Sequence, residues 1–241
     1  MWDKPITKTL FTLNVGGYSP EITRLTYPLL RRYARRIGAN FHVIAERKFP
    51  KWPVTYEKLQ IWELAQRLGS DWNIYVDSDV LVHPETIDFT PHLPRDTVAH
   101  NDRDMAAVRW RYDRFFLRDG RNIGSCNWLA VASDWCVDLW RPLDDLTVRE
   151  ALANIRPTVD ETCTVVTREH LIDDYALSRN IAKYGLKCAT LKDVLARVGL
   201  PDANYFWHAY TIPAGEKAAR MREVLSAWRV EEFLRRGGEK E

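Results

Sequence analysis

Short apolar segments alternate with helix-like segments in the N-terminal part of the chain, and this alternation constrains the fold more than any other feature. The strand-like residues 10–15 end at Gly16-Gly17, and a second strand-like segment covers 41–45. Between them, apolar residues from Leu30 to Ile37 repeat with helical spacing, and Gly38 follows. Strand, glycine turn, helix and strand in this order predict a βαβ unit of a parallel sheet.

The alternation continues along the chain. Helical spacing recurs over 61–68, ahead of Gly69, and the strand-like residues 73–76 follow. Further patterns predict a strand over 128–132, a capping box over 147–150, a helix over 173–184, a strand over 186–191 and an amphipathic helix over about 214–236. We therefore expect a single α/β domain over residues 1–241, with a mostly parallel central sheet flanked by helices.

Composition narrows the class of protein. Of the 241 residues, 46% are hydrophobic and 28% are charged, which excludes a disordered or a fibrous chain. Lys and Arg number 35 against 33 Asp and Glu, so the net charge of +2 by itself indicates neither a nucleic-acid nor a membrane partner. The four cysteines form no CxxC pair, and no apolar run approaches the roughly 20 residues of a membrane span. The first residues of the sequence also do not resemble a signal peptide. Together these features predict a cytoplasmic protein with reduced thiols.

The acidic triplet Asp77-Ser78-Asp79 is informative through its position. A second Asp-x-Asp triplet occurs at 102–104, so the pattern alone means little. Asp77, however, directly follows the apolar residues 74–76, and ligands of open α/β sheets bind at the carboxyl ends of strands. Two carboxylates there can hold a divalent cation, which in turn binds a diphosphate. The alternative is a solvated acidic turn, which would place two negative charges between apolar segments at a cost in free energy.

A family resemblance rests on this region. Lys58-Leu59 on a predicted helix, followed by residues 73–82, resembles the segment that leads into the DxD motif of GT-A-fold glycosyltransferases, especially family 8 and the related galactosyl- and mannosyltransferases. Further segments resemble these enzymes in the same order, over roughly residues 9–217. The resemblance implies a Rossmann-like GT-A fold and transfer of a sugar from a UDP-sugar, with Mn²⁺ or Mg²⁺, to a glycan, a small molecule or a modified DNA base. It also favours retention of the anomeric configuration.

The resemblance further implies a donor site. The turn after the first strand is similar to the family's nucleotide-binding turn, a later Asn-x-Gly segment is similar to one that lines the sugar pocket, and two lysines are candidates for the diphosphate. For each lysine a solvated charge is the alternative. The residues concerned are Leu13, Asn14, Tyr18, Lys58, Asp77, Ser78, Asn122, Gly124, Gly215 and Lys217.

Metal-binding and catalytic candidates complete the expected site. Asp77, Asp79 and, by the resemblance, His208 offer two oxygens and a nitrogen, a set that suits Mn²⁺ better than Ca²⁺. Asp173 and Asp174 resemble the acidic segment beneath the donor sugar and are the candidate catalytic residues. They could position the acceptor hydroxyl, act as a base or stabilise a developing oxocarbenium charge. Capping of the following helix is their structural alternative.

Arginines alternate with aromatic residues over 109–118. Arg109, Arg111, Arg114 and Arg118 could bind phosphates while the aromatic residues stack on bases, so a nucleic-acid acceptor is a hypothesis. The same segment could instead stack on sugar rings or cover a core. A second arginine group over 31–36 lies on the outer face of its predicted helix. Such a group usually indicates a solvated helix surface.

Two other functions remain open. The strand before Asp77-Ser78-Asp79 also resembles the first motif of haloacid-dehalogenase-type phosphatases, in which Asp77 would be the nucleophile. That family normally carries the motif on its first strand, whereas a complete βαβ unit precedes it here. A non-catalytic nucleic-acid-binding module would leave the acidic turn unexplained.

Overall fold

The computed structural model describes residues 5–100, 126–159, 165–200, 205–210 and 212–230. Their centre is a six-stranded sheet in the order β2-β1-β3-β6-β5-β9. Its strands are β1 (Lys8–Leu13), β2 (Ala39–Ile44), β3 (Trp72–Val76), β5 (Thr97–His100), β6 (Leu129–Ser133) and β9 (Lys187–Thr190). Only β6 among these six runs against its neighbours, because it pairs antiparallel with both β3 and β5. The expected mostly parallel α/β sheet is thereby confirmed.

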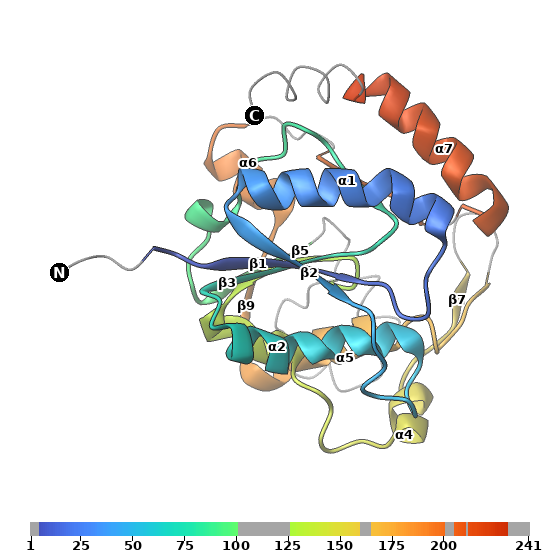
Figure 1. Ribbon diagram of the computed structural model, residues 1–241. Helices are drawn as coiled ribbons and strands as arrows, with labels where there is room; N and C mark the ends of the chain where they lie inside the picture. Colours follow the sequence, from blue (N-terminus) through green and yellow to red (C-terminus); the bar gives the residue numbers. More distant parts are fainter. Residues whose placement is uncertain (1–4, 101–125, 160–164, 201–204, 211, 231–241) are drawn as a thin grey trace.

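Helices cover both faces of the sheet (Figure 1). On one face lie α1 (Pro20–Arg36), α6 (Leu191–Arg197) and α7 (Ala214–Ala227), and their apolar residues share a core with the sheet. On the other face lie α2 (Ile61–Leu68) and α5 (Ile172–Tyr184), together with the 3₁₀ helix η3 (Asp134–Trp140). Successive residues of β3 point to opposite faces of the sheet, because side chains alternate along a strand. Ile74 and Val76 therefore pack in the core under α1, and Tyr75 packs in the core under α2 and α5.

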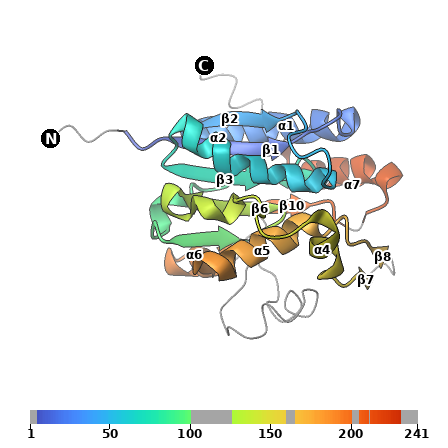
Figure 2. The same cartoon turned by 90° about the horizontal axis from the view of Figure 1, so that it is seen from below.

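Shorter elements surround the carboxyl edge of the sheet. The strands β4 (Val80–Val82) and β10 (Phe206–His208) pair antiparallel, as do β7 (Thr158–Val159) and β8 (Val165–Val166). Figure 2 places α4 (Val148–Ala153), the β7 and β8 pair and α7 at the end of the molecule toward which β1 runs. The other 3₁₀ helices are η1 (Val54–Gln60) and η2 (Thr90–His92).

Local sequence patterns account for several element ends. Gly69 and Gly185 adopt the left-handed conformation at the ends of α2 and α5, where a side chain would be strained. The predicted capping box is present, since the Thr147 hydroxyl accepts from the amide of Glu150 and the Glu150 carboxylate accepts from the amide of Thr147. The C-terminal helix ends earlier than expected: α7 stops at Ala227, and Arg229 has a φ of 51°, which cannot continue an α-helix.

No helix within the described ranges combines the length and the apolarity needed to cross a bilayer. The cysteines of the described part, Cys126, Cys136 and Cys188, form no disulfide; Cys163 lies outside it.

Candidate active site

The acidic turn begins where β3 ends and is fixed by its middle residue. The Ser78 hydroxyl donates to the carbonyl of Leu13 at the end of β1, and the Ser78 carbonyl accepts from the Thr26 hydroxyl of α1 at 2.7 Å. Ser78 is only 5% exposed, so its contacts hold the turn against the first strand and the first helix. The carboxylates of Asp77 and Asp79 on either side of it remain partly exposed.

His208 reaches the turn through a long-range strand pair. In the β10 and β4 ladder His208 lies opposite Val80, and the amide of Ala209 donates to the Asp79 carbonyl at 3.2 Å. His208 Nε2 then lies 3.3 Å from Asp79 Oδ1. One ligand atom from each of Asp77, Asp79 and His208 lies within 4.8 Å of the others.

The donor chemistry of these three residues fits a divalent metal. Two carboxylate oxygens and one imidazole nitrogen are the ligand types of Mn²⁺ sites, and Mg²⁺ is also bound by carboxylates. The three residues are half-buried, so their ligand atoms are partly accessible. The structure therefore brings together the three residues that were expected to bind metal.

Lys217 also contacts the acidic turn. It lies in the first turns of α7, and its Nζ is 2.6 Å from Asp79 Oδ2, while the Tyr18 hydroxyl donates to the same oxygen at 3.4 Å. Burial opposes ionisation of Asp79, but the contacts with His208 and Lys217 outweigh it and hold the pKa of Asp79 well below its usual range. Gly215 is exposed in the same helical turn as Lys217, with open space around its Cα.

Lys58 is buried between two carboxylates. Its Nζ lies 2.9 Å from Asp77 Oδ1 and 2.6 Å from Asp173 Oδ2, and it donates to the carbonyl of Asn127 at 2.5 Å. An ammonium group has three N–H donors, so these contacts use all of them. Burial disfavours the charged amine, but Asp173 and Asp77 overcome this effect and raise the pKa of Lys58 above its ordinary value.

Asp173 and Asp174 lie in the first turn of α5 and are almost completely buried. The N-cap of α5 is Leu171, so neither aspartate occupies the capping position that was the structural alternative. Burial raises the pKa of Asp173, and the contact with Lys58 offsets this only in part. Asp173 Oδ1 is buried without a hydrogen-bond partner, a costly state that in native proteins calls for a functional explanation.

Two more buried polar atoms without partners lie near the end of β1, one in the turn after β1 and one on α1. Asn14 Oδ1 and the hydroxyl of Tyr27 each lack a hydrogen bond. Burial raises the pKa of Tyr27, and the neighbouring side chains of Ser78 and Asn14 lower it in part, so these groups lie close together. A polar ligand group that enters here can satisfy both atoms.

Sequence reasoning missed three of these contacts. The Tyr75 hydroxyl donates to Asp77 Oδ1, and its position two residues before Asp77 on a strand could have indicated a shared face. Tyr27 and the carbonyl of Asn127 are brought in by tertiary packing, and no local pattern marks them.

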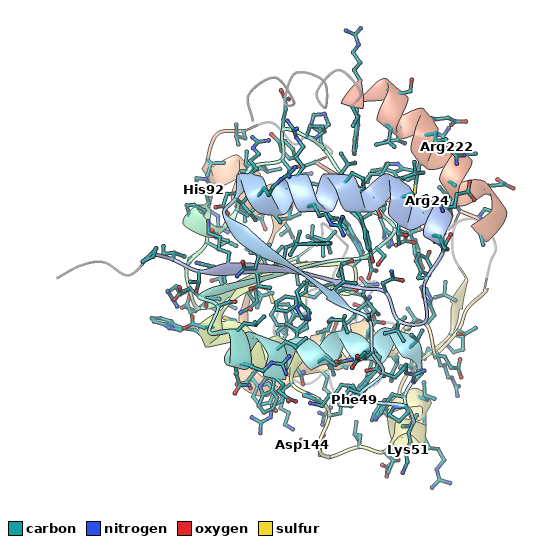
Figure 3. The ribbon with its side chains drawn as sticks, viewed as in Figure 1. Arg24, Phe49, Lys51, His92, Asp144 and Arg222 are labelled. Atoms are coloured by element: carbon teal, nitrogen blue, oxygen red, sulfur yellow. The ribbon has the colours of Figure 1, made fainter. Side chains whose placement is uncertain are left out.

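Some of the predicted residues are not among those that the structure describes. Asn122, Gly124 and the arginines of 109–118 fall outside the described residues. Of the arginines over 31–36, three are exposed and one is half-buried on the outer side of α1. Arg24 of α1 and Arg222 of α7 belong to neighbouring helices on the same face of the sheet (Figure 3).

Comparisons with known proteins complete the description of the site. No family model matches the chain, and neither does any curated protein. Among solved structures, galactosyltransferase LgtC in complex with donor and acceptor sugar analogs shares 15% identity over 91% of this chain and 95% of that chain, with a TM-score of 0.52.

Two further structures have lower TM-scores. A glycosyltransferase involved in glycosylation of the major capsid of PBCV-1 matches at 14% identity over 89% and 99% of the two chains, with a TM-score of 0.48. A Drosophila β1,4-galactosyltransferase 7 mutant in complex with manganese, UDP-Gal and xylobiose matches at 9% identity over 84% and 71%, with a TM-score of 0.40. The likeness to LgtC is a likeness of fold, and it shows that this chain has the GT-A fold predicted from its sequence.

Proposed function

We propose that this protein is a metal-dependent glycosyltransferase that moves a sugar from a UDP-sugar to an acceptor hydroxyl. The observation that carries the proposal is the meeting of Asp77, Asp79 and His208 at the carboxyl edge of a GT-A sheet. Ligands of α/β sheets bind at this edge, and a nucleotide sugar requires a site that neutralises its diphosphate. Neither the described residues nor the similar structures support binding of nucleic acid.

Asp77, Asp79 and His208 would hold the metal, Mn²⁺ or Mg²⁺. When bound, such an ion supplies positive charge that stabilises the leaving diphosphate. Lys217 brings a second positive charge to this turn, since its partly exposed ammonium contacts Asp79 from the first turn of α7. A lysine in this place can pair with a diphosphate oxygen once its contact with Asp79 is released, as we expected for Lys217.

Lys58 was a sequence candidate for the diphosphate, and its contacts favour a positioning role instead. All of its N–H donors are used by Asp77, Asp173 and the carbonyl of Asn127, and it is only 3% exposed. We therefore assign it to the positioning of the two carboxylates rather than to direct binding of the diphosphate. The buried cation also reduces the repulsion between the metal-binding turn and Asp173.

Asp173 and Asp174 are the catalytic candidates. Lys58 occupies one oxygen of Asp173, and the other oxygen has no partner and is free to accept a hydrogen bond from a sugar or acceptor hydroxyl. A carboxylate held in this way can also stabilise positive charge at the anomeric carbon. Asp174 lies in the same helical turn and is equally buried, so it is the second catalytic candidate.

We assign the donor site to the residues from the acidic turn to the end of β1. Leu13, Asn14 and Tyr18 are assigned to the nucleotide, with the unpartnered Asn14 Oδ1 as the atom that a base or ribose would satisfy. Ser78 supports this wall by joining the acidic turn to Leu13. The assignment of Asn122 and Gly124 to the sugar pocket remains a prediction from sequence.

The test is release of UDP from a panel of UDP-sugars in the presence and absence of Mn²⁺. We expect metal-dependent release from at least one UDP-sugar, and loss of release in Asp79→Asn. The matched control is Asp138→Asn, which changes a half-exposed aspartate on η3. NMR of the product's anomeric proton reports whether configuration is retained, the outcome that the family resemblance favours.

The competing phosphatase predicts the opposite result. Hydrolysis of phosphate monoesters by the wild type, with loss in Asp77→Asn and no response to any nucleotide sugar, would refute the transferase. The fold gives the phosphatase no support, since β3 is the third strand along the chain and a βαβ unit precedes its acidic turn.

A further inference from the structure

Four aromatic side chains form a continuous row beside the candidate metal site. We call Trp128, His208, Tyr210 and His170 the aromatic row. The ring centroids of Trp128 and His208 are 5.1 Å apart, those of His208 and Tyr210 are 5.7 Å apart, and those of His170 and Tyr210 are 6.4 Å apart. The three interplanar angles are 32°, 30° and 32°, so successive rings are only moderately tilted.

The row leads from the candidate metal site to the protein surface. Its inner end adjoins the acidic turn, because the amide of Asp77 donates to the carbonyl of Trp128 at 2.9 Å and His208 contacts Asp79. The Trp128, His208 and Tyr210 residues are half-buried, whereas His170 is exposed. Only His170, at the end of the row that lies farthest from the metal site, is therefore exposed.

The outer end of the row is close to the catalytic candidates in the chain. His170 lies in the turn before α5, three positions ahead of Asp173. Tyr210 packs partly against the core cluster that contains Ile172 and Tyr175 of the same helix. A ligand on the row would thus lie between the metal-binding turn and the start of α5.

The chemistry of the row suits a saccharide. A pyranose ring has apolar faces made of C–H groups and a rim of hydroxyls, and aromatic rings provide flat apolar surface together with polar atoms at their edges. The row has such atoms in the imidazole nitrogens, the indole N–H and the Tyr210 hydroxyl. Small-molecule sites commonly combine aromatic surface with a few polar groups in this way.

We propose that the aromatic row is the acceptor subsite and that it takes a pyranose ring of a saccharide. The proposal rests on the transferase function and specifies the class of its acceptor. Of the four residues of the aromatic row, only His208 already has a role in the donor and metal chemistry. Tyr210 and His170 then contact acceptor rather than donor. Within the described residues the row lies beside an acidic turn, which favours an uncharged glycan over an anionic nucleic acid.

The test measures saccharide binding by the full-length protein on an array of oligosaccharides with terminal glucose, galactose, mannose or xylose. The tightest-binding array saccharide is then titrated calorimetrically into wild type, His170→Ala and Tyr210→Leu. We expect affinity to fall by about 3- to 10-fold in each variant, the size of one lost aromatic contact. The control is Trp135→Ala, whose ring is 67% exposed on η3 and outside the row.

Kinetics provides a second readout. In the transferase reaction the two row variants should raise the KM for the acceptor far more than the KM for the UDP-sugar. A protein that releases UDP from a UDP-sugar but binds no saccharide on the array overturns the acceptor subsite and leaves the transferase proposal standing. Binding that is unaffected by either row variant also overturns it. Saccharide binding by the row without any response to UDP-sugars refutes the transferase instead.

Discussion

Lys58 Nζ lies 2.6 Å from Asp173 Oδ2, and both side chains are almost completely buried. The pair joins η1 to the first turn of α5 across 115 positions of the chain. Because Lys58 also contacts Asp77, this single ammonium group connects the candidate metal site with the candidate catalytic carboxylate. The arrangement explains how several acidic side chains can be packed together beneath one site.

Lys58→Met is expected to destabilise the protein strongly. The substitution removes the cation that contacts both Asp77 and the buried Asp173. Loss of one partner of a buried ion pair lowers the free energy of unfolding by about 3–5 kcal/mol. Urea unfolding measures the free energy of unfolding. Lys58→Met with Asp173→Asn should be less destabilised than the sum of the two single variants. A loss below about 1 kcal/mol in Lys58→Met, typical of a surface pair, would contradict this account.

Tyr75→Phe should weaken metal binding while the fold is kept. The Tyr75 hydroxyl donates to Asp77 Oδ1, and removal of a group that orients a metal-binding carboxylate typically lowers metal affinity by about 10- to 100-fold. Calorimetric titration with Mn²⁺ measures the change. The matched control is Tyr33→Phe, because the buried Tyr33 hydroxyl donates to the carbonyl of Ile87 at 3.1 Å, away from the site. Equal Mn²⁺ affinities in both variants would exclude an orienting role for Tyr75.

Lys217→Met should change metal binding and turnover in opposite directions. Without nucleotide, Lys217 competes with Mn²⁺ for Asp79 Oδ2. A partly exposed ion pair of this kind contributes about 1 kcal/mol, so removal of Lys217 should tighten Mn²⁺ binding by about fivefold. UDP release should fall, because the diphosphate loses a cationic partner. Mn²⁺ titration and steady-state kinetics on one preparation separate the two effects, and a fall in both quantities would show that Lys217 does not compete for Asp79.

The capping box of α4 predicts a dependence of stability on pH. Hydrogen bonds from Thr147 to the Glu150 carboxylate lower the pKa of Glu150 in the folded protein. A lowered folded pKa means that this contribution is present above the unfolded pKa of about 4.3 and is lost as pH falls through the folded pKa. Wild type should therefore exceed Glu150→Gln in stability at neutral pH, and the difference should vanish in acid. Thermal unfolding at several pH values checks this, and a difference that is constant with pH would contradict it.

Much of the local structure could be predicted because its causes are local. The helix predicted over 61–68 coincides with α2, since periodic apolar residues and a terminal glycine define both its buried face and its end. The helix that ends at Gly185 and the capping box at Thr147 follow from equally short patterns. The place of Asp77 at the carboxyl end of a strand was also readable, because the apolar strand directly precedes it.

Other features depend on which segments meet in space. The antiparallel direction of β6 could not be read from its residues, because side chains alternate with a period of two whichever way a strand runs. The burial of Lys58 could not be read from its neighbours along the chain, because only the packing of η1 against α5 shows that two carboxylates and a carbonyl use its three donors.

The sequence by itself determined the alternation of strands and helices and the acidic turn, since both follow from neighbours along the chain. The family resemblance added His208, and only the tertiary structure put it next to Asp79, through the pairing of β10 with β4. The same long-range packing decided the burial of Lys58 and the stacking of the aromatic row. Most of these contacts join residues far apart in the chain, and no local pattern encodes their geometry.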